Sequence, residues 1–172
     1  NALDYERVRF SKAHGNWPDY RKSNSAHDKS GFMVSWCHGA PGIALSRACL
    51  WGTALWDEQC VDEISVALCT MAEKDWFRFD HLCCGTLGLM LIQQALCSGP
   101  WPIAAELRAR SEQAAAAIQR STLERCSTEP ISLRCLITHE GTLMLPGFFT
   151  GLSGMGMALL DDPKSRGITL QL

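Results

Sequence analysis

The chain has 172 residues, of which 47% are hydrophobic and 20% are charged, and its formal net charge is -2. This length suits a single domain with its own core, and the composition is that of a soluble globular protein. So small a net charge gives no electrostatic reason to expect nucleic acid or an acidic membrane as a partner. Residues 1–7 carry charges where a signal peptide needs an apolar core, and no apolar stretch is long enough to span a bilayer. We therefore expect one cytoplasmic domain over residues 1–172, without a membrane span.

Cysteine is unusually frequent, with nine residues in the chain. Their number is odd, their spacing is uneven and no secretory signal precedes them, so a disulfide framework is the weaker interpretation. The cysteine content favours a reducing compartment with metal or thiol chemistry.

The first predicted elements are a long loop and two helices of different character. Residues 11–30 are rich in Gly, Pro, Asn, Asp and Ser, which predicts a long loop. Gly39 and Gly42 then open a segment of small and apolar residues, which is typical of a helix buried on most of its surface. Residues 57–74 place apolar side chains at helical spacing among acidic ones, which predicts an outer, amphipathic helix.

The same alternation continues toward the end of the chain. Residues 85–88 repeat the glycine pair and open a second buried helix, and residues 102–125 predict a second amphipathic one. Residues 127–147 are an irregular insertion with a short hairpin near its centre, and residues 151–154 repeat the glycine pair a third time. Buried and amphipathic helices alternating at a period of about 45 residues predict an all-α fold of stacked hairpins, as in an α/α toroid or a helical solenoid.

Three cysteines occupy equivalent places in this repeat. Cys37 and the pair Cys83 and Cys84 lie just ahead of the glycines that open the first two buried helices. If these helices pack with the same polarity, their N-termini meet, and helix N-termini stabilise thiolates. Three thiolates without a fourth protein ligand are the set expected of a catalytic zinc, whose open position takes water or substrate. The alternative is that these cysteines are simply small buried residues, since no C-x-x-C signature is present.

Three motifs together resemble those of a known family. Residues 35–42 (SWCHGAPG), 82–85 (LCCG) and 146–154 (PGFFTGLSG) are similar in order and spacing to the closing motifs of the lanthionine synthetase C-like family. The resemblance is greatest to the C-terminal cyclase domain of class II lanthipeptide synthetases, and it runs from about residue 17 to the end. It implies an α/α toroid with a zinc ion held by Cys37, Cys83 and Cys84, as in members with an all-cysteine site.

The resemblance also implies an activity. Family members add a cysteine thiol of a dehydrated precursor peptide to a dehydroalanine or dehydrobutyrine of the same peptide, which forms the thioether ring of lanthionine or methyllanthionine. Zinc would keep that thiol deprotonated. His38, which follows a predicted ligand, is a candidate acid or orienting group for protonation of the enolate carbon. A histidine at a helix start is more often a cap or packing residue, so that interpretation stays open.

The chain departs from the family pattern in two respects. The family toroid has about twice as many helices as this chain supplies, and the usual acid/base histidine lies upstream of the first zinc cysteine. We therefore expect only the C-terminal part of the domain, which needs the upstream half as a partner for turnover. A second possibility is a catalytically incomplete zinc-binding remnant that acts as a binding or assembly module.

Overall fold

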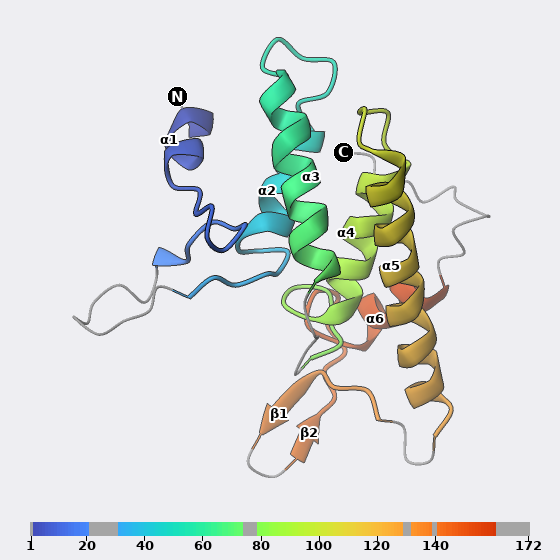
Figure 1. Ribbon diagram of the computed structural model, residues 1–172. Coiled ribbons are helices and arrows are strands. Elements are labelled where there is room, and N and C mark those ends of the chain that lie inside the picture. Colours follow the sequence, from blue (N-terminus) through green and yellow to red (C-terminus); the bar gives the residue numbers. More distant parts are fainter. Residues whose placement is uncertain (1, 21–30, 74–78, 129–131, 139–140, 161–172) are drawn as a thin grey trace.

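The computed structural model describes residues 2–20, 31–73, 79–128, 132–138 and 141–160. Most of this part is helical, and one antiparallel hairpin lies within it (Figure 1). The helices are α1 (Ala2–Val8), α2 (Ala40–Ala48), α3 (Glu58–Ala72), α4 (Thr86–Ser98), α5 (Ala105–Cys126) and α6 (Leu152–Leu160), and the hairpin pairs β1 (Leu136–Thr138) with β2 (Gly141–Leu143). The all-α expectation is thus confirmed apart from this hairpin, which lies inside the predicted insertion at 127–147.

The helix boundaries follow the signals in the sequence closely. Helices α2, α4 and α6 begin at the three glycine pairs. Helix α3 begins after Asp57, whose side chain accepts a hydrogen bond from the backbone N–H of Cys60 at 3.0 Å and so caps the helix. Helix α5 starts at Ala105, three residues later than predicted from Pro102. In the described residues 11–20 of the predicted loop there is no α-helix.

Consecutive helices form antiparallel hairpins. Figure 1 shows α2 and α4 running in one direction and α3 and α5 in the opposite direction. The N-termini of α2 and α4 therefore lie toward the same end, as the repeat predicts. These hairpins agree with part of an α/α toroid, although the described helices do not by themselves form a closed ring. None of the described helices has the length and apolarity that crossing a membrane would need.

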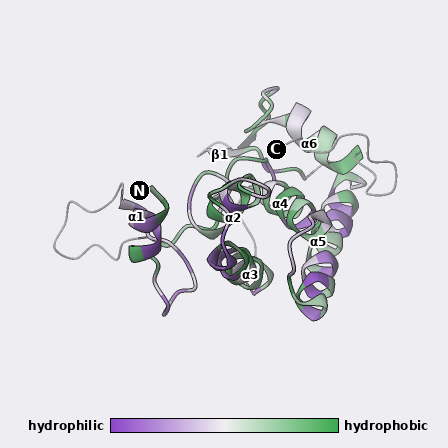
Figure 2. Ribbon diagram, turned by 90° about the horizontal axis from the view of Figure 1, so that it is seen from above, coloured by the Kyte–Doolittle hydropathy of each residue, from purple (hydrophilic) through white to green (hydrophobic). Residues whose placement is uncertain are grey.

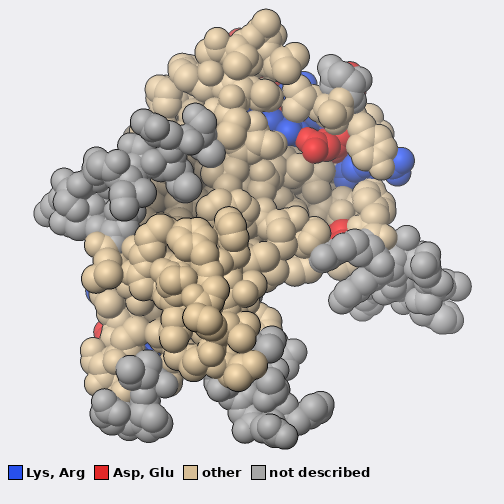
Figure 3. Space-filling view, turned by 180° about the vertical axis from the view of Figure 1, so that it is seen from behind, with Lys and Arg blue, Asp and Glu red and all other residues tan. Residues whose placement is uncertain are grey.

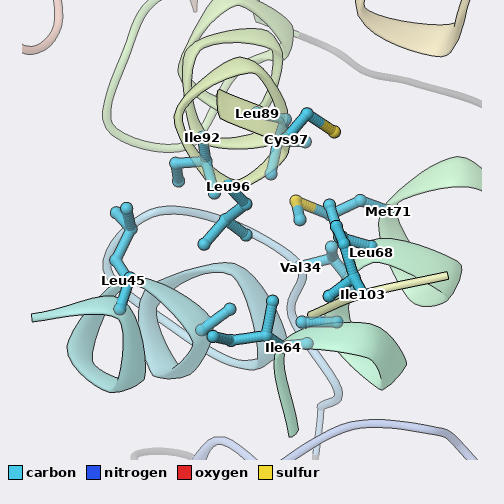
Figure 4. Packing of buried hydrophobic residues seen from close by; sticks show 14 of the residues in the cluster. Val34, Leu45, Ile64, Leu68, Met71, Leu89, Ile92, Leu96, Cys97 and Ile103 are labelled. Atoms are coloured by element: carbon cyan, nitrogen blue, oxygen red, sulfur yellow. The ribbon is translucent and has the colours of Figure 1, made fainter. Parts of the chain in front are cut away.

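Helix α4 is the centre of the packing. One side contributes Leu89, Ile92 and Leu96 to a core shared with α2 and α3 (Figure 4). Another side contributes Leu87 and Met90 to a second core shared with α5 and α6. Seen from above, α4 is mainly hydrophobic whereas α5 alternates hydrophobic and hydrophilic residues (Figure 2). This is the predicted distinction between an inner helix and an outer, amphipathic one.

Charged side chains attach α1 to the hairpin of α2 and α3. The guanidinium of Arg47, which is 1% exposed, donates to Glu63 at 2.7 Å and to Glu6 of α1 at 2.7 Å. Arg7 of α1 donates to Asp57 at 2.7 Å. On the face drawn in Figure 3, uncharged side chains cover most of the described surface, and the largest group of charged atoms contains both signs.

Candidate metal centre

The three cysteines singled out from the repeat meet at the N-terminal ends of α2 and α4. The sulfur of Cys37 lies 3.4 Å from that of Cys84 and 3.6 Å from that of Cys83. The sulfurs of Cys83 and Cys84 are 3.5 Å apart. Cys37 is exposed and the other two are half-buried, so the triad is open to solvent on one side.

The glycine repeat explains why these residues converge. The second glycine of each pair packs against the backbone carbonyl of the residue six positions earlier, so closely that a Cβ atom would overlap it. Each turn therefore folds back on the first turn of its helix. The residue directly after the packed carbonyl is thereby held near the helix N-terminus. The glycine and carbonyl pairs are Gly42 with Trp36, Gly88 with Leu82, and Gly154 with Phe148.

The spacing of the sulfurs fits a tetrahedral metal. A zinc ion with Zn–S bonds of about 2.3 Å holds its sulfur ligands about 3.8 Å apart. The three sulfur separations of 3.4, 3.5 and 3.6 Å are nearly equal and close to that value. Cys37, Cys83 and Cys84 therefore form a group that could hold a metal ion. An all-thiolate donor set suits a soft or borderline ion such as zinc rather than magnesium or calcium.

The three thiols differ in how readily they lose a proton. Burial raises the pKa of Cys37, but hydrogen bonds from Ser35, whose Oγ lies 3.6 Å from the sulfur, and from the two other cysteines bring that pKa below the ordinary value. Burial raises the pKa of Cys83, and burial together with the neighbouring cysteines raises the pKa of Cys84 to about 12. The triad thus favours one thiolate, and a bound cation is needed to stabilise the second and third.

His38 directly follows Cys37 in the sequence. Its backbone pairs with that of Ser35 in a tight turn, with Ser35 N to His38 O at 3.0 Å. Its side chain is half-buried, and within the described residues its imidazole has no hydrogen-bond partner.

His81 lies behind the ligands rather than at the surface. It is 6% exposed, and its Nδ1 accepts a hydrogen bond from the backbone N–H of Cys84 at 3.3 Å. Burial lowers the pKa of His81, which favours the neutral ring that an accepting Nδ1 requires. His81 therefore supports the backbone of the second cysteine turn and is not exposed to solvent.

Asp80 was not singled out from the sequence, and it anchors the second cysteine turn. It is fully buried, and its carboxylate accepts from the backbone N–H of Arg134 at 2.9 Å, from the Arg134 guanidinium at 3.1 Å and from that of Arg125. It also accepts from the Thr86 hydroxyl at 3.2 Å, at the first residue of α4. The turn carrying Cys83 is thereby tied to the end of α5 and to the segment before β1.

Comparison with known protein families identifies the family of the chain. Residues 1–165 match the family described as "Lanthionine synthetase C-like protein", which includes lanthionine cyclases. No curated protein and no solved structure matches the chain significantly. Because the family match extends over nearly the whole chain, the chain belongs to the lanthionine synthetase C-like family.

Proposed function

We propose that the chain is the C-terminal, metal-binding part of a zinc-dependent peptide cyclase of the class II lanthipeptide synthetase type. The observation that carries this proposal is the convergence of three thiols at 3.4 to 3.6 Å in a member of the lanthionine synthetase C-like family. Cys37, Cys83 and Cys84 would hold the zinc, and the fourth position would remain for substrate. When bound, zinc supplies the positive charge that keeps a substrate thiol deprotonated.

The substrate we propose is a precursor peptide that contains cysteine and dehydrated serine or threonine residues. The cysteine sulfur forms a bond to the β-carbon of dehydroalanine or dehydrobutyrine, and the electron pair of the alkene moves to the α-carbon as an enolate. A proton then reaches that carbon, which completes lanthionine or methyllanthionine. The open side of the triad, where Cys37 is exposed, leaves room for the peptide.

His38 is the residue we propose for proton delivery. It adjoins Cys37 in sequence, and its ring has no hydrogen-bond partner among the described residues. His81 is less suited because it is buried and already accepts from the Cys84 backbone. A positioned general acid typically contributes about 10²-fold or more in rate.

Ring closure of a dehydrated peptide tests this proposal. The chain is loaded with zinc and supplied with the upstream half of the domain in cis or as a second chain. Unreacted cysteines are then alkylated, so that mass spectrometry separates open from closed peptide. We expect zinc-dependent closure, abolished in Cys84→Ala and slowed about 10²-fold in His38→Ala.

The matched control is His14→Ala. His14 is an exposed loop residue whose ring stacks on Phe32 with centroids 3.7 Å apart, and its substitution should leave the rate unchanged. Closure at the spontaneous rate in the complete, zinc-loaded domain would contradict the cyclase proposal.

A second candidate function is a zinc-binding module without turnover. One observation favours it: two described histidines lie within two residues of a triad cysteine, His38 and His81, and the His81 ring is already bonded to the Cys84 backbone. One zinc per chain combined with no acceleration in the complete domain would support the module. Acceleration that depends on the three cysteines would exclude it.

A further inference from the structure

Helix α2 begins without a cap of its own, directly after the turn that carries Cys37. Its N-cap residue is Gly39, which has no side chain and lies at φ 81°, in the left-handed region that favours glycine. The missing cap comes from Asn16, 24 residues upstream, whose Oδ1 accepts from the backbone N–H of Ala40 at 2.6 Å. The start of α2 is thus fixed by a residue from a different segment.

The same side-chain amide also holds the other end of the turn. Asn16 Nδ2 donates to the carbonyl of Met33 at 3.0 Å, and Asn16 Oδ1 also accepts from the N–H of Trp17 at 2.8 Å. Met33 lies before Cys37 and Ala40 lies after it. A single amide group therefore bridges both ends of the segment that presents the Cys37 sulfur.

The bridge is tight and shielded from water. Asn16 is fully buried. A Cβ atom built on Gly39 would overlap the Met33 carbonyl and approach Asn16 Oδ1 to 2.7 Å, so Asn16, Met33 and Gly39 are packed without free space between them. Within this arrangement the Cys37 segment has little freedom to shift toward or away from Cys83 and Cys84.

We propose that Asn16 is a positioning residue of the metal centre, which bridges Met33 and Ala40 and so holds the Cys37 sulfur in register with the Cys83 and Cys84 sulfurs. Asn16 is not itself a ligand, and it acts through the backbone on either side of Cys37. Partners that orient metal ligands typically change metal affinity by about 10- to 100-fold when they are removed. The inference rests on the proposed function only in that the triad must bind a metal.

The test uses Co²⁺ as the probe, with the full chain and no peptide substrate. Affinity is measured by competition with a chromophoric chelator, and the thiolate-to-cobalt absorption per bound ion reports how many sulfurs coordinate. We expect Asn16→Ala to bind Co²⁺ at least about 10-fold more weakly and to show weaker thiolate absorption, because Cys37 is no longer held in place. Asn16→Asp keeps the oxygen that caps Ala40 but loses the donor to Met33, so it should show a smaller loss of affinity.

Thr70→Val is the matched control. The Thr70 hydroxyl donates to the Gly15 carbonyl at 2.7 Å, so it anchors the same loop through a partly buried hydrogen bond but does not reach the Cys37 segment. We expect the Co²⁺ affinity of Thr70→Val to stay within about twofold of the affinity of the unsubstituted protein. This is a much smaller change than the loss caused by removing a ligand-orienting group.

Two results would overturn the proposal. One is unchanged Co²⁺ affinity and absorption in Asn16→Ala, or in Asn16→Asp if Asn16→Ala does not fold. The other is an equal loss in Asn16→Ala and Thr70→Val, which would mean that Asn16 only anchors the loop. If the unchanged chain bound no Co²⁺ at all, the proposed metal site would fail as well, so the two failures are distinguishable.

Discussion

The backbone N–H of Cys83 donates a hydrogen bond to the carbonyl of Phe149 at 2.9 Å. These two residues hold the same position in successive repeats, each directly after the residue whose carbonyl packs on a glycine. The third repeat therefore reaches the turn that carries Cys83 but has an aromatic residue where the first two repeats have cysteine. The Phe149 ring also meets Trp36 edge-on, with centroids 5.9 Å apart. The third repeat thus adds an aromatic pair beside the first two turns, and among the described residues the group that could hold a metal contains three thiols.

The packing of the repeat glycines can be tested at Gly88. A Cβ at this position would overlap the Leu82 carbonyl and its carbon, next to Cys83. Although alanine is ordinarily the better helix former, we expect Gly88→Ala to lower the free energy of unfolding by about 1–3 kcal/mol, because the backbone of the turn must move. Chemical denaturation measures the change.

Gly156→Ala on α6 is the matched control for Gly88→Ala. No atom lies within 4 Å of a Cβ at Gly156. Without a clash, only helix propensity remains, and stability should rise by about 0.5–1 kcal/mol. Equal effects of the two substitutions would show that the close packing at Gly88 has no energetic consequence.

The anchoring of the second cysteine turn can be tested at Asp80. Asp80→Ala removes a fully buried carboxylate that Arg125 and Arg134 share. We expect a loss of about 3 kcal/mol in unfolding free energy, because two partly buried guanidinium groups are left unpaired. Zinc affinity should fall as well, since the turn carrying Cys83 loses its attachment.

Glu73→Gln is the corresponding control for an exposed ion pair. Glu73 accepts from Arg110 at 3.4 Å, and both side chains are more than half exposed. Its loss should change stability by less than about 0.5 kcal/mol and leave zinc affinity unchanged. Comparable losses at Asp80 and Glu73 would remove the anchoring role from Asp80.

Metal binding should depend steeply on pH. The pKa of Cys84 is raised to about 12 and that of Cys83 lies above its ordinary value, so both carry protons at pH 7 in the metal-free chain. Binding as thiolates releases these protons, so affinity must increase as pH rises. We expect an increase of at least about 100-fold per pH unit, because at least Cys83 and Cys84 each release a proton, and the increase should persist toward pH 9. Calorimetry in buffers of different ionisation enthalpy counts the protons. Release of fewer than one proton per metal would contradict three-thiolate binding.

The glycine pairs were enough to locate the inner helices because they mark a local requirement, the return of a turn onto its own helix. Asp57 likewise marks the start of α3, since its side chain caps a residue three positions away. Asn16 and Asp80 carried no such local signal. Their roles depend on contacts with Ala40, 24 residues away, and with Arg134, 54 residues away. Helical periodicity cannot identify contacts between residues so far apart in the sequence.

The cysteines were identified partly by position and partly by resemblance. Their places ahead of the repeat glycines predicted that they would converge, and the sulfur separations of 3.4 to 3.6 Å agree with that prediction. The identity of the metal, the role of His38 and the closed toroid were implied by the family resemblance and remain predictions, because neither residue spacing nor helical periodicity specifies them.

The metal content of cysteine variants tests the central claim most directly. Elemental analysis of purified protein should give one zinc per chain, and Cys37→Ala, Cys83→Ala and Cys84→Ala should each lose stoichiometric zinc. Cys97→Ala is the matched control, because Cys97 is a buried thiol at the opposite end of α4 from Gly85. It should retain one zinc per chain. Equal zinc content in all four variants would contradict the assignment of the triad as the metal centre.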